Sequence, residues 1–344
     1  MKYLMISSYP PMKCGIGTYA YQMAQSLENG GESVDVLSPI EGGGNIKTDL
    51  RGYFNILKIL RYSRNYNKII LQYHEAFYYA DRNLMNLFNI LCTHISFTIL
   101  FFLLKDKIEV IVHEIPYAHA SKANYFFEKM KWHVCQKMVF HTHKEVESFE
   151  ATYFRLSSDQ FAINHHNKYF LKYCNESKDE SRRKLSISTE SIIFLCIGFI
   201  QPHKGFDIAL NSFKGTKKPM ELYVVGSLRV QWGEYIDYLS NLVSLSKEIP
   251  NAHVVNQYLT DEEFDRWINA SDVIVIPYKE IWSSGVVARA KLFEKPVIAR
   301  NTGGLKDQLE KTDLVFDNDA DLGEIFMQFS SFIGAVPNLC DSLT

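Results

Sequence analysis

Short apolar segments alternate with longer amphipathic ones along this sequence, and this alternation limits the fold more than any other feature. In the first half, the predicted strands are 2–8, 33–38, 68–73, 108–113, 138–141 and 161–164. The predicted helices lie between them, at 16–29, 49–66, 81–105, 120–136 and 144–153. Strands that are joined through helices run parallel and are buried on both faces. The first half is therefore predicted to be an α/β domain with one parallel sheet.

The same alternation restarts in the second half. The predicted strands are 191–200, 221–225, 253–256, 272–276 and 296–299, and the predicted helices are 205–213, 235–248, 260–269 and 285–293. The segment between the halves, 172–184, is densely charged and has no clear periodicity, which favours a linker. Open parallel sheets bind ligands at the carboxyl ends of their strands. We therefore expect an α/β fold of two Rossmann-like domains facing across a cleft, at 1–170 and 189–344, with a linker at 171–188.

Composition narrows the class of protein further. A length of 344 residues suits two ordinary domains, and the net charge of −2 lacks the basic excess of nucleic-acid-binding proteins. The six cysteines have no zinc-binding spacing, and a disulfide framework is unexpected in a chain of this length. The apolar run at the N-terminus is too short for a signal peptide, which favours a cytoplasmic protein. We expect no nucleic-acid partner and no metal.

One apolar segment, 84–104, is nearly long enough to span a bilayer. Polar residues interrupt it, and it lies within the strand–helix alternation, which favours a buried crossover helix between two strands. The alternative is a helix with one face on the inner surface of a membrane. Basic residues nearby, Lys58, Arg61, Arg64 and Lys68, would then suit anionic lipids.

Each half of the chain has a glycine-containing junction between its first strand and its first helix, and such a junction can bind an anion. Gly15 and Gly17 follow the first predicted strand and let backbone N–H groups approach an anion at a helix N-terminus. The spacing is not the G-x-G-x-x-G of dinucleotide-binding proteins, because Ala20 stands where the third glycine is expected. In the second half, Lys204 precedes Gly205 at a similar junction, where a cation suits phosphate oxygens.

A third junction joins the predicted strand 272–276 to the predicted helix 285–293. Its helix begins near Gly285, so the first N–H groups of the helix face the carboxyl edge of the sheet. Residues 296–305 repeat the arrangement, with Gly303 and Gly304 after the strand.

Taken together, in this order and spacing, these segments resemble retaining glycosyltransferase family 4, in the variant that has an SGV motif. The resemblance runs from Tyr9 to about Val315. The matching motifs are YPP, CGIGTYA, VVGS, ASDVIVIPY, SGV and KPVIARNTGGL. The family implies the GT-B fold, with 1–170 on the acceptor side and 189–344 binding the sugar nucleotide.

The resemblance also implies the site residues. Those expected to bind the nucleotide are Gly15, Gly17, Gly198, Lys204, Gly226, Ser284, Gly285, Val286, Val287 and Arg289. Those expected to be catalytic are His113, Lys204 and Glu280. In such enzymes the leaving phosphate helps to deprotonate the acceptor, so no protein nucleophile is required. No cofactor and no metal are expected, because the sugar nucleotide is a substrate.

The sequence departs from the family pattern at three positions. Where the family has two glutamates, this chain has Ile281 and Arg289, with Glu280 beside the first of them. The arginine that the family carries after the glycine of the second-half loop corresponds to Phe199.

We therefore expect a retaining hexosyltransferase-type enzyme that moves a sugar from a nucleoside-diphosphate donor to a glycan or lipid-linked acceptor, in polysaccharide or glycoconjugate biosynthesis. On the acceptor side, His74, Glu75 and Glu114 follow predicted strands and are candidate contacts. Two alternatives stay open. One is an inactive relative that acts as a binding or partner subunit, and the other is a sugar-nucleotide epimerase of similar architecture.

Overall fold

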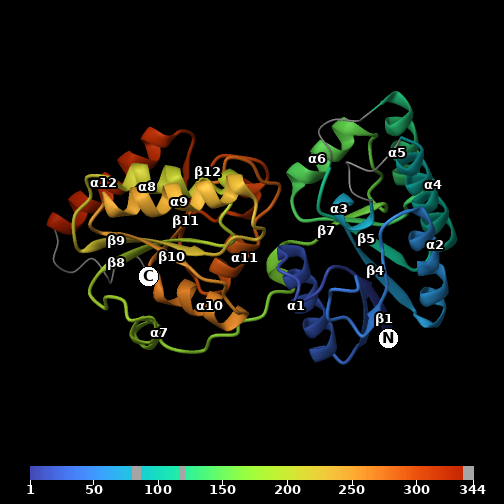
Figure 1. The fold of residues 1–344 in the computed structure, drawn as a ribbon, viewed down its shortest axis with the longest axis horizontal. Coiled ribbons are helices and arrows are strands. Elements are labelled where there is room, and N and C mark those ends of the chain that lie inside the picture. Colours follow the sequence, from blue (N-terminus) through green and yellow to red (C-terminus); the bar gives the residue numbers. More distant parts are fainter. Residues whose placement is uncertain (80–86, 116–120, 336–344) are drawn as a thin grey trace. The chain divides into compact units, whose positions relative to one another are not determined.

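The structure is a computed structural model, and it describes residues 1–79, 87–115 and 121–335. The chain forms two compact units, Met1–Phe170 and Leu171–Thr344, and each is described by itself. Each unit is a parallel sheet with helices packed on it, as Figure 1 shows. The prediction of two Rossmann-like α/β domains is confirmed.

The first unit follows the predicted alternation. Its strands are β1 (Lys2–Ile6), β2 (Ser33–Ser38), β3 (Ile46–Lys47), β4 (Lys68–Tyr73), β5 (Ile108–Val112), β6 (Met138–Phe140) and β7 (Phe161–Ile163). Its helices are α1 (Gly15–Asn29), α2 (Tyr53–Tyr62), α3 (Glu75–Tyr78), α4 (Leu87–Leu103), α5 (Lys122–Val134) and α6 (His143–Thr152), with short 3-10 turns η1 (Ser63–Asn65) and η2 (His166–Lys168).

The strands of this unit form a seven-stranded parallel sheet in the order β3-β2-β1-β4-β5-β6-β7. The chain leaves β1 in one direction to β2 and later continues in the other direction from β4 to β7. This reversal places α1 on one face and the crossover helices on the other, because parallel crossovers are right-handed. On the α1 face, Met5, Ile70 and Ile111 pack against Tyr19 and Met23.

The second unit repeats this plan. Its strands are β8 (Ile192–Ile197), β9 (Met220–Gly226), β10 (Ala252–Asn256), β11 (Val273–Ile276), β12 (Val297–Arg300) and β13 (Leu314–Phe316). Its helices are α7 (Lys178–Leu185), α8 (Phe206–Phe213), α9 (Gly233–Lys247), α10 (Asp261–Ala270), α11 (Gly285–Leu292) and α12 (Asp319–Ala335), with short 3-10 turns η3 (Pro202–Lys204) and η4 (Leu305–Gln308).

These six strands pair in the order β10-β9-β8-β11-β12-β13, all in parallel. In Figure 1, α8, α9 and α12 cover one face of the sheet, and α10 and α11 cover the other. The sequence pattern did not predict α12. Phe326 of this helix packs edge-on against Phe194 of β8 and Phe213 of α8, so the C-terminal segment completes the core of its own unit.

The charged segment that was expected to be a linker is in part a helix of the second unit. Ser177 and Glu180 form a capping box that starts α7. Arg182 of α7 is buried, where it donates to the carbonyl of Ala270 and pairs with Asp272. The charged side chains of this segment therefore form ion pairs, some of them buried and some at the surface.

The apolar segment 84–104 contains α4, the crossover helix between β4 and β5; residues 84–86 lie outside the described residues. Its inward side is buried, with Phe97 and Phe101 in ring contact with each other. Across 1–79, 87–115 and 121–335, no helix is long and apolar enough to cross a bilayer.

Candidate functional site

The carboxyl edge of the second sheet brings three of the predicted segments together. Gly226 ends β9 so close to Gly198, just after β8, that a Cβ on Gly226 would collide with the Gly198 carbonyl oxygen. A Cβ on Gly198 would in turn lie 4.0 Å from the Val286 side chain at the start of α11. The two glycines and the α11 N-terminus therefore lie side by side.

The loop that carries Lys204 is fixed to the same edge by its backbone. Gly205 has a φ of +62°, and a Cβ there would collide with the carbonyl oxygen of Pro277, directly after β11. The Lys279 N–H also donates to the His203 carbonyl, 2.8 Å away. A glycine is required at 205 both for the left-handed conformation and for this close approach.

The Lys204 ammonium lies over an aromatic ring rather than beside a carboxylate. Its Nζ is 3.8 Å from the ring centroid of Tyr278, which is fully buried. Burial lowers the pKa of Lys204 to about 7. Among the residues that the structure describes, Lys204 forms no ion pair, so its charge is available to an anionic ligand.

The N-terminus of α11 lies beside this lysine loop and is held from both sides. The Ser284 hydroxyl accepts from the Val287 N–H at 3.3 Å, so Ser284 is the N-cap. The Gln308 side chain accepts from the Ser284 N–H and donates to its carbonyl, at 2.6 and 3.1 Å. The first helical N–H groups, at Gly285 and Val286, have no acceptor within the helix and suit an anion.

The second glycine loop fixes the segment that precedes Ser284. Gly303 has a φ of +55°, and a Cβ there would collide with the Ile281 carbonyl oxygen. The Gly304 N–H donates to the Trp282 carbonyl at 3.0 Å. The side chain of Glu280, which precedes these residues, is exposed to solvent.

Arg289, which is expected to contact the nucleotide, is held by α10. Its guanidinium Nε donates to the buried Asp265 carboxylate at 2.8 Å, and its NH1 donates to Asp261 at 2.8 Å. It also lies 4.4 Å from the ring centroid of Phe264. These contacts occupy the guanidinium, so Arg289 joins α11 to α10.

In the first unit, the glycine loop after β1 leads into α1 as predicted. Gly15 is the first residue of α1, and a Cβ there would meet no atom within 4 Å. Gly17 packs on Ser8, where a Cβ would lie 3.2 Å from the Ser8 backbone. No acidic residue lies in the first turn of α1, and its N-cap Cys14 makes no side-chain cap. The helix N-terminus therefore keeps its favourable potential for an anion.

His113 lies at the carboxyl end of β5 among other histidines. Its Nε2 is 2.6 Å from the Gln72 Oε1, and its ring centroid is 5.2 Å from that of His141. His141 in turn stacks on His166 at 3.7 Å, and Tyr19 packs edge-on against all three rings. Burial lowers the pKa of each of these histidines, so they are neutral at pH 7.

The acceptor-side candidates lie at the same edge of the first sheet. The His74 Nδ1 is 3.3 Å from the Glu114 Oε2, which joins the ends of β4 and β5. Glu75 is the first residue of α3. No group of three or more His, Cys, Asp or Glu side chains in the described part of the chain could hold a metal ion.

The structure adds two residues that sequence analysis did not select, Tyr278 and Gln308. Tyr278 ends the motif ASDVIVIPY, and its position two residues after a buried strand was the available signal. Gln308 has no sequence signal, because its contact with Ser284 spans 24 residues.

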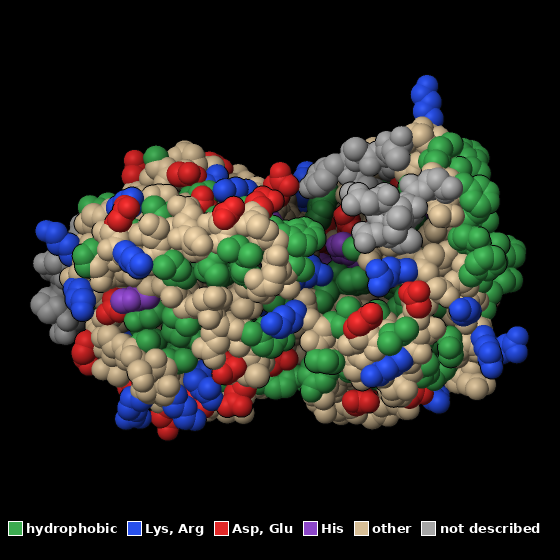
Figure 2. All heavy atoms as spheres, viewed as in Figure 1, with side chains coloured by type: hydrophobic (Ala, Val, Ile, Leu, Met, Phe, Trp, Pro, Cys, Tyr) green, Lys and Arg blue, Asp and Glu red, His purple; other side chains and the backbone are tan. Residues whose placement is uncertain are grey.

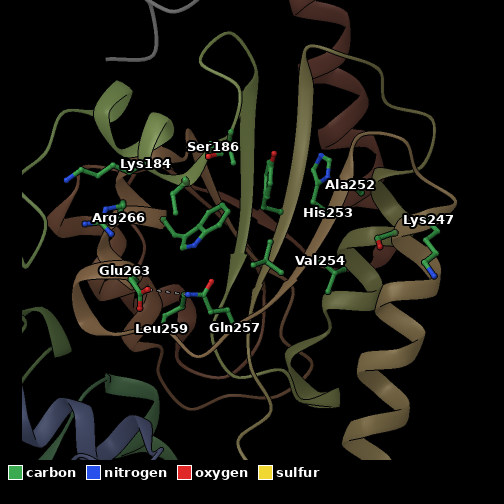
Figure 3. Close-up of a pocket in the computed structure, with 16 residues that line it drawn as sticks. Lys184, Ser186, Lys247, Ala252, His253, Val254, Gln257, Leu259, Glu263 and Arg266 are labelled. Carbon is green, nitrogen blue, oxygen red and sulfur yellow. Dashed lines mark hydrogen bonds between the residues drawn. The ribbon is translucent and has the colours of Figure 1, made fainter.

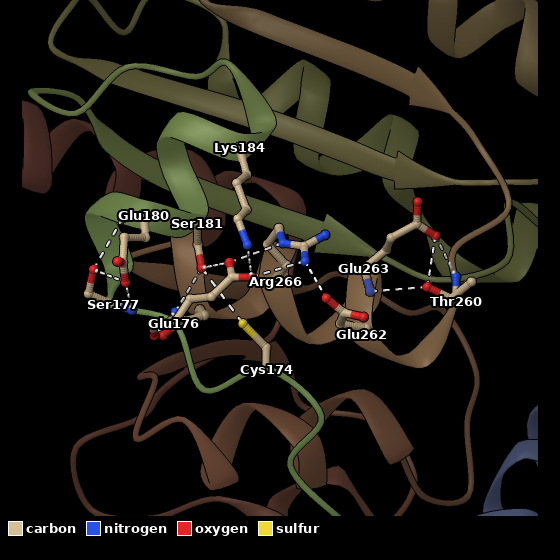
Figure 4. A network of polar contacts seen from close by, with 11 residues as sticks. Cys174, Glu176, Ser177, Glu180, Ser181, Lys184, Thr260, Glu262, Glu263 and Arg266 are labelled. Atoms are coloured by element: carbon tan, nitrogen blue, oxygen red, sulfur yellow. Dashed lines mark hydrogen bonds and ion pairs between the residues drawn. The ribbon is translucent and has the colours of Figure 1, made fainter.

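A cavity of about 850 Å³ lies away from these residues, along the edge strand β10 and the helices α7, α9 and α10 (Figure 3). None of the predicted site residues lines it. Two of its cations, Lys184 and Arg266, pair with Glu176 at 2.6 and 3.0 Å (Figure 4). Hydrogen bonds from Arg266 and then Lys184 lower the pKa of Glu176 to about 2. Glu176 thus supplies a counter-charge to Lys184 and Arg266 within this lining.

A family model matches the second unit in sequence, and solved structures match both units in fold. Residues 177–328 match the family described as "Glycosyl transferases group 1". A lipopolysaccharide 1,2-N-acetylglucosaminetransferase from Salmonella typhimurium is 24% identical over 140 residues, which are 39% of this chain and 37% of that protein. The match therefore spans little more than a third of the curated relative.

Solved structures resemble nearly the whole chain. Anabaena Alr3699/HepE in complex with UDP and glucose has a TM-score of 0.70 at 14% identity, over 95% of this chain and 89% of that one. Sucrose-phosphate synthase from Thermosynechococcus elongatus has a TM-score of 0.68 at 16% identity, and the match covers 96% of this chain and 90% of that one. WaaG, a glycosyltransferase involved in lipopolysaccharide biosynthesis, has a TM-score of 0.63 at 12% identity, and the match covers 96% of this chain and 90% of that one. The chain thus has the GT-B fold, and residues 177–328 match the family of glycosyl transferases group 1.

Proposed function

We propose that this chain is a retaining glycosyltransferase of family 4 that moves a sugar from a nucleoside-diphosphate donor to a glycan or lipid-linked acceptor. The proposal extends to polysaccharide or glycoconjugate biosynthesis in the cytoplasm, with contact at the inner face of the membrane. The match to a lipopolysaccharide N-acetylglucosaminetransferase and the UDP-glucose complex of a similar fold support it.

One observation carries the proposal: the Lys204 ammonium and the N-terminus of α11 lie on one carboxyl edge of the second sheet. Lys204 has no carboxylate partner among the described residues, and burial lowers its pKa, so a bound diphosphate would supply the missing counter-charge. The N–H groups of Gly285 and Val286 would bind the same phosphates. Gly15, Gly17, Gly198 and Gly226 would let the nucleotide approach the backbone closely.

In the proposed reaction, the bond between the anomeric carbon and the diphosphate breaks as the acceptor oxygen forms the new bond on the same face. The departing phosphate takes the acceptor proton, so the chain supplies no nucleophile. Lys204 and the α11 N–H groups stabilise the negative charge that develops on the diphosphate. His113 would contact the donor sugar, and Glu280 would replace the first family glutamate. The proposal includes no metal and no cofactor.

The first experiment is a thermal-shift screen against UDP-, GDP- and ADP-sugars, followed by an assay for sugar transfer and for the configuration of the product. Stabilisation by one nucleotide and retention at the anomeric carbon are expected. Lys204→Ala is expected to abolish turnover, whereas Lys214→Ala, an exposed lysine paired with Glu248, keeps it. Turnover that survives Lys204→Ala would remove the role of this lysine.

An inactive relative is the second candidate, because Arg289 replaces a family glutamate and is engaged with Asp261 and Asp265. That candidate predicts no stabilisation by any sugar nucleotide. The epimerase alternative predicts conversion of the donor sugar without an acceptor, which the same assay detects.

A further inference from the structure

The outward side of α4 exposes a continuous stripe of large apolar side chains. Between Leu87 and Leu103 the helix contains no charged residue. Six of its apolar side chains are exposed, on one side of the helix at helical spacing: Leu87, Phe88, Ile95, Ile99, Phe102 and Leu103. Figure 2 shows hydrophobic side chains gathered along the edge of the molecule where Figure 1 draws α4.

Helix α2 packs beside α4 and extends this surface. Phe54 of α2 is exposed, and Lys58 and Arg61 follow it at spacings of four and seven residues, on the same side of the helix. The carboxyl ends of the two helices are adjacent, because the Lys107 Nζ donates to the Ser63 carbonyl at 2.8 Å. We call these exposed apolar side chains of α4 and α2 the α4–α2 face.

Cations surround one end of the α4–α2 face. Lys58, Arg61, Arg64 and Lys105 are all exposed, and Arg61, Arg64 and Lys105 form no ion pair among the described residues. Within 53–66 and 87–107, the one acidic residue is Asp106. The surface therefore combines an apolar stripe with an excess of positive charge.

We propose that the α4–α2 face docks on the surface of an anionic lipid bilayer. An apolar stripe bordered by lysine and arginine is the arrangement that inserts shallowly among acyl chains while its cations contact anionic headgroups. No helix in the described part of the chain is both long and apolar enough to cross a bilayer, so the proposal places α4 on the surface. A second copy of this face carries the same positive charge, whereas an anionic lipid surface supplies the opposite charge. The inference deepens the membrane contact that the proposed function includes, but it is argued from this face alone, and its test does not depend on the transferase activity.

Co-sedimentation of the full chain with lipid vesicles tests the proposal without any sugar nucleotide. Vesicles of phosphatidylcholine alone are compared with vesicles that contain roughly 30% phosphatidylglycerol. The anionic lipid gives the second set a negative surface potential that attracts lysine and arginine. Binding to the anionic vesicles, little binding to the neutral ones, and loss of binding in high salt are expected.

Matched variants separate the apolar and the charged contributions. Phe102→Ser is compared with Trp232→Ser in the second unit, because the two side chains are 61% and 62% exposed. Only Phe102→Ser is expected to weaken partition. Replacing Arg61 and Lys105 by Gln is expected to weaken it roughly 30-fold, the effect of two charges near an anionic surface. The control double variant replaces Lys217 and Lys311, which are exposed in the second unit, and is expected to bind as the parent does.

Far-UV circular dichroism establishes that each variant is folded before it is compared. Equal partition on neutral and anionic vesicles, or equal partition of Phe102→Ser and the parent, would overturn the proposal. A dimer in size-exclusion chromatography that Phe102→Ser dissociates, without vesicle binding by the parent, would overturn it in favour of an interface between copies of the chain.

Discussion

At the scale of single residues, the proposed contact between Lys204 and the diphosphate predicts that donor binding depends on pH. Burial lowers its pKa to about 7, so the side chain is charged below pH 7 and increasingly neutral above it. If Lys204 binds the diphosphate, affinity for the nucleoside diphosphate falls as pH rises through about 7. Lys204→Arg keeps its charge over this range, because a guanidinium does not titrate there.

Isothermal titration of the preferred nucleotide between pH 6 and 8.5 measures this dependence. Lys204→Arg is expected to bind with a flatter pH profile than the parent. Parallel profiles for the two proteins would show that Lys204 does not titrate in the binding step.

Glycines at two junctions are predicted to differ in their effect on stability. Gly205→Ala places a Cβ against the Pro277 carbonyl at a φ of +62°, and we expect a loss of roughly 1–3 kcal/mol in the free energy of unfolding. Gly15→Ala, which meets open space at the start of α1, is the matched control and is expected to leave stability nearly unchanged. Urea denaturation of both variants measures the difference; equal midpoints would contradict this account of the lysine loop.

At the scale of elements, α10 and α11 are joined by a buried ion pair. Asp265 is fully buried and accepts from Arg289, so removal of the guanidinium leaves its carboxylate without this partner. Arg289→Met is expected to cost roughly 3–5 kcal/mol of the free energy of unfolding.

Chemical denaturation measures this cost, and titration with nucleotide under native conditions measures binding. If Arg289 joins the helices, folded Arg289→Met keeps the affinity of the parent for nucleotide, and Asp265→Leu in the same chain recovers part of the stability. A specific loss of nucleotide affinity without loss of stability would restore Arg289 to the donor site.

At the scale of the whole molecule, the neutral histidines of the first unit make the fold sensitive to acid. Burial lowers the pKa of His141 to about 4, and it holds those of His113 and His166 well below the ordinary value. The unfolded chain therefore binds protons first as pH falls below about 6.5, and stability declines from there towards pH 4. For His141 alone this amounts to about 3 kcal/mol.

Urea midpoints at pH 7.5, 6 and 5 test this expectation. His141→Gln is expected to show a smaller decline than the parent, because one buried titrating group is absent. His143→Gln, two residues away and exposed, is the control and should follow the parent. An unchanged decline in His141→Gln would assign the acid sensitivity to other groups.

Many elements could be predicted from the sequence, because their signals are local. The strands 33–38 and 68–73 have the predicted bounds, and α10 begins within one residue of the predicted helix 260–269, at a capping box of Thr260 and Glu263. The predicted helix 49–66 is shorter, since α2 ends at Tyr62 and a 3-10 turn follows. Helix α12 was missed, because its apolar contacts with β8 and α8 are made across more than a hundred residues.

The sequence by itself determined the two parallel α/β units and the glycine and lysine junctions at their strand ends, because periodicity and backbone conformation are encoded over a few residues. Only the tertiary structure decided how the polar side chains of those junctions are engaged. It joined Arg289 to α10, set Lys204 on the ring of Tyr278 and packed His113 against other rings. It also left one side of α4 exposed. Burial and charge pairing depend on which distant segments pack together, and local sequence does not specify these contacts.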